Sequence, residues 1–268
     1  MNVLNRLTAI FTLQVFVLTM LISTARAADV NVSNIRLFTL FPGSHNTANY
    51  VTTTLLPQLI GSDDQLRQRL GFSSLAEINS LVSPDPPFAV FRVGLSRLQT
   101  FNSALSTISL LLEEENWFQF SPPTPAVGPV RYLFPIRESS RPASGCPYSS
   151  LLDSTIPGCV ASSVQVKLLS GTWEFQQIGR PGLIKKLTKF GNGGTHVVIW
   201  IPVLNLYYLA SLDTSGVNLN IKAITNDPYV KDPITGNQFK AGETLTGNEV
   251  FKQLKIAVQS IGQNDPPG

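Results

Sequence analysis

Residues 164–178, with the sequence VQVKLLSGTWEFQQI, say the most about the fold. Ser170 and Gly171 suit the two-residue turn of a β-hairpin, and such a turn fixes the register of the strands on either side. In that register apolar residues face apolar ones on one side of the sheet, and opposite charges face each other on the other side. The predicted cross-strand pairs are Val166 with Phe175, Leu168 with Trp173, and Lys167 with Glu174.

More strands are expected after this hairpin. Residues 195–201 and 203–210 are apolar with little alternation, which predicts two strands that are buried on both faces. Residues 217–225 alternate between apolar and polar, as expected of a strand with one wet face. Residues 183–190 predict a short basic helix that ends at Gly191.

The first half of the chain carries the stronger helical signals. Apolar residues recur every three or four positions over residues 95–112, which predicts one amphipathic helix. Residues 62–65 and 74–77 fit the capping box, as do residues 246–249 before a final helix that Gly262 is expected to end. Strands are expected only at residues 30–41 and 88–93 in this half.

These patterns predict an α+β fold made of a single mixed domain. A helix-rich N-terminal half would pack on a largely antiparallel sheet from the C-terminal half, because the long apolar strands need something to cover them. The domain would span residues 28–268. The proline-rich residues 121–130 must be extended, and they are the best candidate for a boundary between two subdomains.

The N-terminus predicts export. Within residues 1–27, the basic residue Arg6 is followed by an apolar stretch and then by Ala25-Arg26-Ala27, which are the three parts of a cleavable signal peptide. The apolar stretch is shorter than the roughly 20 residues that cross a bilayer, so an uncleaved anchor is the less favoured alternative. The mature protein is expected to be periplasmic or secreted, with no transmembrane segment.

Charge argues against a nucleic-acid partner. The chain has 20 basic and 17 acidic residues, and removal of Arg6 and Arg26 with the signal peptide leaves 18 against 17. A protein that neutralises many phosphates needs a basic face, and this balance does not supply one. At 43% hydrophobic and 14% charged residues, the chain is expected to fold around a sizeable core.

The two cysteines, Cys146 and Cys159, are expected to form a structural disulfide. Export would place them where thiols oxidise, and no third cysteine competes. A redox or metal site is the alternative, but the spacing is not Cys-x-x-Cys and two thiols do not complete a zinc shell. No metal and no cofactor is predicted.

The search for catalytic residues leaves one weak candidate. The sequence lacks Gly-x-Ser-x-Gly, Ser-x-x-Lys and His-Glu-x-x-His, which excludes the common serine-hydrolase and zinc-protease signatures. Of the two histidines, His196 precedes a buried strand beside flexible glycines, where a neighbour could tune its pKa. A strand-edge histidine bonded to the backbone is the competing interpretation, and the same holds for His45 in its loop.

Three other groups of residues have a functional and a structural interpretation each. The basic residues could meet an anionic lipid or polymer, the aromatic residues could line a ligand cavity, and the acidic run could hold a cation. A solvated surface or core packing is the favoured interpretation of each group, and the functional one is the alternative. The groups are Arg180, Lys185, Lys186 and Lys189; Trp200, Tyr207 and Tyr208; and Glu113, Glu114 and Glu115.

These observations favour a non-catalytic exported protein that binds a partner or ligand of the cell envelope. The partner is not identified by any motif. The alternative is an envelope hydrolase with His196 as general base and carboxylates brought in by folding. An acidic residue beside the His196 ring, next to a hydroxyl, would favour the hydrolase; an apolar setting would favour the binding protein.

Overall fold

One mixed β-sheet forms the centre of the part of the chain that the computed structural model describes. The described residues are 64–65, 81–82, 87–112, 116–119, 127–138, 159–169 and 172–264. The chain divides into two compact units, residues 1–35 and 36–268, and every described residue belongs to the second.

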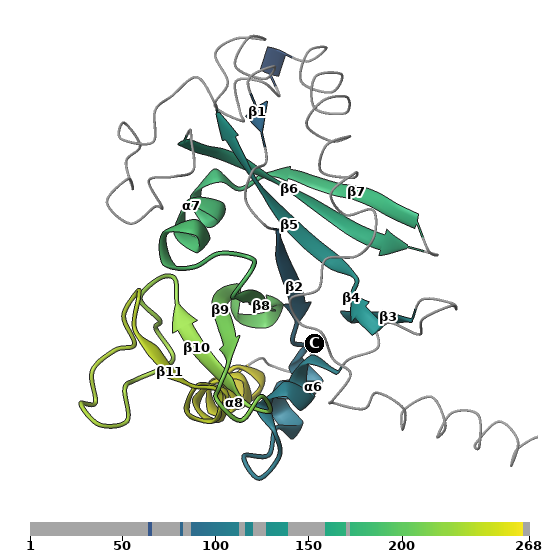
Figure 1. Ribbon diagram of the computed structural model, residues 1–268. Coiled ribbons are helices and arrows are strands. Elements are labelled where there is room, and N and C mark those ends of the chain that lie inside the picture. Colours follow the sequence, from purple (N-terminus) through teal and green to yellow (C-terminus); the bar gives the residue numbers. More distant parts are fainter. Residues whose placement is uncertain are drawn as a thin grey trace, which may run out of the picture. The chain divides into compact units, whose positions relative to one another are not determined.

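The sheet runs in the order β11-β10-β9-β8-β2-β5-β6-β7 (Figure 1). Neighbours are antiparallel throughout except for β2 and β8, which are parallel. The strands on this path are β2 (Phe88–Arg92), β5 (Arg131–Glu138), β6 (Cys159–Leu169), β7 (Thr172–Gly179), β8 (Val197–Ile201), β9 (Leu206–Leu212), β10 (Leu219–Ala223) and β11 (Thr244–Thr246). β1 (Leu81–Val82) pairs with β5, and β3 (Trp117–Gln119) pairs with β4 (Val127–Pro129) in a separate two-stranded sheet.

The predicted division into a helix-rich N-terminal half and a sheet from the C-terminal half is wrong. The described residues hold three α-helices, α6 (Leu95–Thr100), α7 (Pro181–Phe190) and α8 (Gly247–Asn264), and two of them belong to the C-terminal half. The N-terminal half instead contributes β2, which lies in the middle of the sheet. The pairing of β2 with β8 also makes the sheet mixed, because strands so distant in the sequence need not meet as a hairpin.

The long helix predicted over residues 95–112 is broken in two. α6 ends at Thr100, and a separate 3-10 helix follows at Thr107–Leu111. Between them the Asn102 side chain accepts a hydrogen bond from the backbone amide of Ala104, at 3.0 Å. Asparagine and serine side chains compete with helical hydrogen bonds in this way, so the apolar period alone overestimated the helix.

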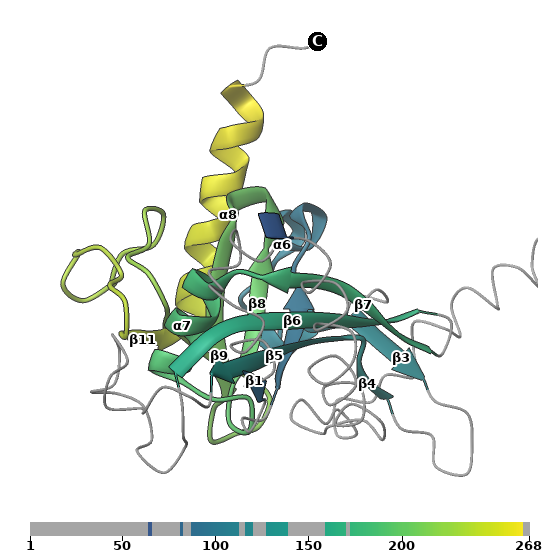
Figure 2. The same ribbon diagram turned by 90° about the horizontal axis from the view of Figure 1, so that it is seen from above.

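The helices cover opposite faces of the sheet, as Figure 2 shows for α7 on one side and for α6 and α8 on the other. Beneath α7 lies a core cluster that its own Ile184 and Leu187 complete. α6 and α8 pack against each other, with the rings of Phe101 and Phe251 edge to face at 5.9 Å. We call these two surfaces the α7 face and the α8 face.

Of the two longer helices, α8 begins as predicted and α7 begins earlier than predicted. α7 starts at Pro181 rather than at residue 183, and proline suits the first helical position because its missing N–H is no loss there. At the start of α8, Thr246 and Glu249 exchange the hydrogen bonds of the predicted capping box. The predicted stop at Gly262 is wrong, since α8 continues to Asn264.

The hairpin of β6 and β7 has the predicted register at all three predicted pairs. Beyond them the register shifts by one, so that Gln165 lies opposite Gln177 and Gln176 is the extra residue. Such a β-bulge adds one residue to one strand of an antiparallel pair. It brings Val164 opposite Ile178, which keeps apolar residues together.

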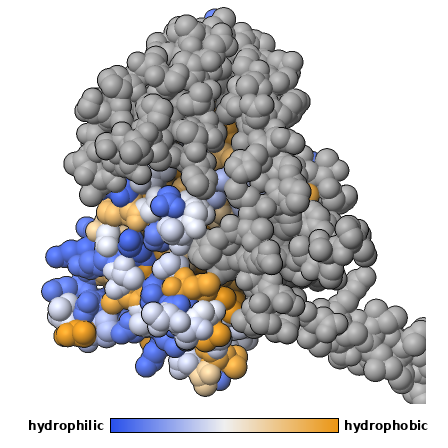
Figure 3. Space-filling view, in the orientation of Figure 1, coloured by the Kyte–Doolittle hydropathy of each residue, from blue (hydrophilic) through white to orange (hydrophobic). Residues whose placement is uncertain are grey.

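The surface of the described residues is mixed in character. Figure 3 shows hydrophobic patches between hydrophilic ones on the face seen there, rather than one continuous apolar area. Exposed large hydrophobic side chains come from separate elements, and scattered examples of this kind are normal for a folded protein. They are Leu95, Leu105, Val203, Val217, Tyr229, Ile234 and Ile256.

Several sequence predictions lie outside the described residues. These are the signal peptide at 1–27, the strand at 30–41, the start at 74–77 and most of the start at 62–65, where only residues 64 and 65 are described and are helical. Residues 121–126 of the candidate boundary are also outside, whereas 127–129 form β4. The domain boundaries therefore stay predictions.

Candidate functional site

The centre of the sheet is divided at β2. Phe88 and Ala89 of β2 pair with β5, whereas Val90, Phe91 and Arg92 pair with β8. β5 therefore pairs with the first part of β2 and β8 with the last part, on opposite edges of β2, and the two halves of the sheet meet at this strand. On the α7 face a hollow lies between the two halves of the sheet.

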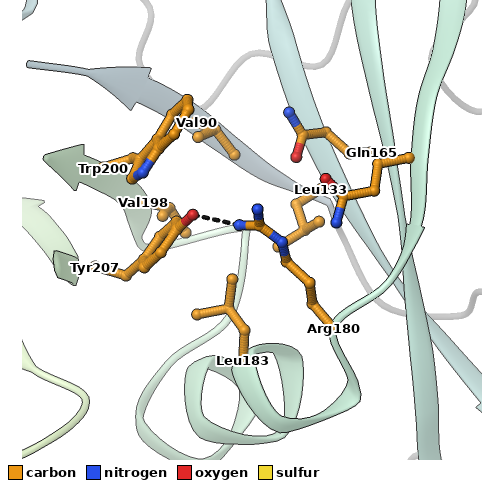
Figure 4. A pocket seen from close by; sticks show the side chains of 9 residues that line it. Val90, Leu133, Gln165, Arg180, Leu183, Val198, Trp200 and Tyr207 are labelled. Carbon is orange, nitrogen blue, oxygen red and sulfur yellow. Dashed lines mark hydrogen bonds between the residues drawn. The ribbon is translucent and has the colours of Figure 1, made fainter. Parts of the chain in front are cut away.

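The hollow is drawn in Figure 4. It is small and open to solvent, with a volume of about 60 Å³, which is well below the roughly 300–1,000 Å³ of typical ligand pockets. Strands from both halves of the sheet and the start of α7 line it. The lining residues are Val90, Leu133, Gln165, Gln177, Arg180, Leu183, Val198, Trp200 and Tyr207.

The apolar lining comes from the core cluster under α7. Val90, Leu133 and Val198 are at most 5% exposed, and all three belong to that cluster. Leu183 of α7 packs against it from the helix side. The hollow therefore has an apolar floor and a rim of larger side chains, most of them half-buried, with Arg180 exposed.

Trp200 and Tyr207 form one wall of the hollow. They are cross-strand partners in β8 and β9, and their rings are stacked, with 6.1 Å between centroids and 5° between planes. The short turn between these strands ends at Asn205, which adopts a left-handed conformation with φ of 52°. Aromatic pairs of this kind supply broad rigid surfaces, and they are common where ligands bind.

Arg180 reaches into the hollow from the turn between β7 and α7. Its Nη1 donates a hydrogen bond to the hydroxyl of Tyr207, and its guanidinium carbon lies 5.6 Å from the Tyr207 ring centroid. Figure 4 shows the guanidinium between the aromatic wall and Gln165. It is the charged group among the lining residues, so the hollow has a positive character.

The backbone of Arg180 is in a conformation that L-residues rarely adopt. Its φ and ψ are 57° and 47°, and it follows Gly179 at φ of 117°. A left-handed non-glycine residue costs on the order of 1–2 kcal/mol. Here it reverses the chain directly after β7, and the reversal directs the Arg180 side chain back over the sheet. Strain of this kind gathers at functional sites.

Gln165 and Gln177 form the opposite wall. They are the cross-strand partners that the β-bulge brings together, and both are half-buried. Within the described part of the chain, neither carboxamide forms a hydrogen bond with a side chain or with the backbone, although each offers two donors and an acceptor. Half-buried polar groups without partners are available to a ligand.

His196 lies away from this hollow, near the C-terminal end of α7. Its Nδ1 is 2.8 Å from the Thr195 hydroxyl, and a Cβ added at Gly191 would come within 2.9 Å of its ring. Burial lowers the pKa of His196 below its ordinary value of 6.5, and the charge of Lys222 lowers it further, while a hydrogen bond to the Asn192 backbone opposes both effects.

The hydrolase hypothesis requires a hydroxyl and an acidic group near the His196 ring. The Thr195 hydroxyl is present, but the charged group that acts on the ring is the cation Lys222. That hydroxyl also lies 3.2 Å from the Asn192 side chain, which holds the turn before β8 together. Lys222 donates a hydrogen bond to the carbonyl of Phe190 at the end of α7, at 3.2 Å. No acidic group acts on the pKa of His196 in the described residues. Catalysis by His196 remains a prediction.

The aromatic group singled out in the sequence is split between two faces. Trp200 and Tyr207 line the hollow, whereas Tyr208 is buried on the α8 face and donates a hydrogen bond to Asp227. Asp227, only 1% exposed, also accepts the backbone amides of Tyr229 and Val230 at 2.7 and 3.1 Å. Burial raises the pKa of Tyr208, as does the Asp227 carboxylate.

The basic group is likewise divided. Arg180 lines the hollow, and Lys189 lies over the Phe190 ring at 5.2 Å. Lys185 is half-buried and Lys186 is exposed on α7, so the group does not converge on one point.

The remaining predicted site residues cannot be placed. His45, Cys146 and the acidic residues 113–115 lie outside the described residues, and only Cys159 is described, at the start of β6. The disulfide between Cys146 and Cys159 therefore stays a prediction. In the described ranges no three His, Cys, Asp or Glu residues are grouped so that they could hold a metal ion.

Within the same ranges, no helix combines the length and the apolar character that crossing a membrane requires.

The sequence analysis did not find the two glutamines or the special backbone of Arg180. Both had a signal in the sequence. The apolar residues of β7 are spaced by two and then by three, at Trp173, Phe175 and Ile178, which indicates a bulge. The run Gly179-Arg180-Pro181-Gly182 indicates a sharp turn before a helix.

Comparison with protein-family models, with curated protein sequences and with solved structures finds no match to this chain.

Proposed function

We propose that this is an exported protein of the cell envelope that binds a small ligand without transforming it, and that the hollow beside β2 is where the ligand binds. The single observation that supports this most strongly is the set of polar groups around the hollow. Gln165 and Gln177 line it and have no hydrogen-bond partner among the described residues, and Arg180 is held toward it by Tyr207.

The fold does not need these polar groups for its own stability. A half-buried carboxamide without a hydrogen bond contributes less than a leucine of similar shape would, because part of its hydration is lost without replacement. Arg180 adds backbone strain to this cost. A position that is unfavourable for folding yet well placed around an apolar floor is the usual arrangement of a binding site.

Native mass spectrometry can test the proposal. The tagged protein is incubated with the small-molecule fraction of its native envelope, purified again and weighed without denaturation. We expect a bound small molecule on the wild-type protein and its loss from the double variant Gln165→Leu with Gln177→Leu. Both substitutions leave the apolar floor intact and remove only the carboxamides.

Gln176→Leu is the matched control. Gln176 is the exposed extra residue of the bulge, next to Gln177 in sequence. The control should keep the ligand. If the ligand stays on the double variant, or if none is captured by the wild-type protein, the hollow is not the binding site that we propose.

A further inference from the structure

We infer that the hollow takes a small anion that carries hydroxyl groups, with Arg180 contacting the anionic group. The inference rests on the proposed function, since it names the class of ligand for that same hollow. It follows from three features of the lining: its charge, its hydrogen-bonding capacity and its size.

The charge of the lining favours an anion. Arg180 contributes a full positive charge, and the lining includes no acidic residue to compensate it. A guanidinium has five N–H donors in one plane, and the bond to Tyr207 directly uses only the Nη1 side. The remaining donors match the paired oxygens of a carboxylate or a phosphate.

Tyr207 holds the guanidinium of Arg180 in position. Its hydroxyl accepts the bond from Arg180, and its ring lies next to the guanidinium at 5.6 Å. Long exposed arginines ordinarily sample many rotamers, and a fixed guanidinium loses less entropy when it binds an anion. Tyr207 is therefore a positioning residue for Arg180.

The two carboxamides favour hydroxyl groups on the same ligand. A carboxamide presents donors and an acceptor together, and a hydroxyl likewise donates and accepts. Gln165 and Gln177 stand directly opposite each other in the sheet, so they can bond neighbouring hydroxyls. The apolar floor and the Trp200 ring can contact the C–H groups of such a ligand.

The size of the hollow limits how much of the ligand it encloses. With about 60 Å³ and an opening to solvent, the hollow admits the anionic group and the atoms nearest to it, while the rest of the ligand lies at the opening. The class is thus a compact hydroxylated anion, such as a sugar acid or a sugar phosphate.

Three probes that share one ring test the inference. Glucuronate carries a carboxylate, glucose 6-phosphate a phosphate, and glucose no charge. Each is titrated to millimolar concentration into ¹⁵N-labelled protein, and the indole N–H resonance of Trp200 is followed. Trp200→Phe assigns that resonance among those of the three tryptophans.

We expect at least one of the two anions to shift the Trp200 resonance and to bind at least about tenfold more tightly than glucose. One charge-assisted hydrogen bond to Arg180 is enough for an about tenfold lower Kd. Which anion binds better distinguishes a carboxylate source from a phosphate source. Binding should also weaken as salt rises, since the contact is ionic and partly exposed.

Arg180→Gln and Lys186→Gln form the matched pair of variants. Each removes one cation, but Lys186 is exposed on α7 and does not line the hollow. Arg180→Gln should lower the affinity for the anion at least about tenfold. Lys186→Gln should leave it nearly unchanged. The comparison of anion with glucose on the wild-type protein needs no variant and holds even if Arg180→Gln folds poorly.

Equal losses from Arg180→Gln and Lys186→Gln would mean that a diffuse basic surface attracts the anion, and would overturn the inference. Glucose that binds as well as the anions would also overturn it, while the proposed function would stand. If no probe moves the Trp200 resonance, the inference is wrong, and the mass measurement described above decides the proposed function independently.

Discussion

Two neighbouring tyrosines of β9, Tyr207 and Tyr208, lie on opposite faces of the sheet and differ in burial and in hydrogen bonding. On the α8 face, Tyr208 is 2% exposed and its hydroxyl bonds Asp227, whose other oxygen caps a loop. On the α7 face, Tyr207 is half-buried beside a strained arginine, and the two carboxamides across the hollow have no hydrogen-bond partner in the described part of the chain. The difference indicates that the polar groups on the α8 face stabilise the fold, whereas those around the hollow are placed for the binding role that we propose.

The largest difference between the faces should appear in the core. Phe251→Ala on the α8 face removes a ring that is 0% exposed, and we expect it to lower the free energy of unfolding by about 3–5 kcal/mol. Trp200→Ala on the α7 face should cost less, because that ring is half-exposed beside a hollow. Denaturant melts of both variants measure this. A greater loss from Trp200→Ala would contradict the comparison.

A smaller effect is expected from the Tyr208 hydroxyl. Tyr208→Phe leaves one oxygen of the buried Asp227 carboxylate without its hydroxyl donor, and this should cost about 1–3 kcal/mol. Tyr207→Phe is the matched change on the other face, where solvent can replace the lost bond, so it should cost less than about 1 kcal/mol. Thermal melts of the pair suffice. Equal costs would show that both hydroxyls serve stability alike.

Two substitutions of Arg180 test whether its backbone is strained. Arg180→Gly and Arg180→Ala both remove the guanidinium, but only glycine tolerates a φ of 57° without strain. The glycine variant should therefore be more stable than the alanine variant by about 1 kcal/mol. Chemical denaturation of the two proteins gives the difference. Variants of equal stability would indicate that residue 180 is not left-handed in solution.

The smallest expected effect is a pH dependence from His196. Its folded pKa lies below 6.5, so the unfolded chain binds more protons in the window just below that value. Stability should be complete above about pH 6.5 and should fall as the pH drops toward the folded pKa. His196→Gln should remove this slope in unfolding measurements taken between pH 7 and 5.

The exposed carboxylates Asp213 and Asp232 do not interfere with that measurement. Hydrogen bonds from Ser215 hold the pKa of Asp213 below 3.8, and those from the backbone amides of Thr235 and Ile234 do the same for Asp232. Their contribution is present above about pH 3.8 and is lost only as the pH falls further. A slope that persists near pH 6 in His196→Gln would assign it to another group.

Local features of the fold were predictable from the sequence, and distant pairing was not. The register at Lys167 and Glu174 followed from one turn and two strands. The capping box at Thr246 and Glu249 followed from three residues of spacing. No local pattern could place β2 beside β8, because that pairing depends on residues more than a hundred positions apart.

The candidate site was only partly predictable for the same reason. Trp200 and Tyr207 were recognised as possible cavity residues because aromatic residues near a strand turn are conspicuous. Tyr208 was grouped with them, but it follows the favoured interpretation of core packing, since a neighbouring residue in a strand points to the other face. Gln165 and Gln177 could be joined only through the bulge, which apolar spacing indicates but does not position.

The place of β2 in the sheet has a consequence for how the protein folds. The strands β6 and β7, and those from β8 to β10, are each joined by short connections and can pair early, and β5 joins the first group through residues 139–158. β2 can pair with β5 and β8 only after both groups of strands have formed, because closing the long loop to β8 is entropically costly and slow. We expect the insertion of β2 between them to be a late, rate-limiting step. The hollow beside β2 would then exist only in molecules that have completed folding, so that ligand capture reports on finished chains alone.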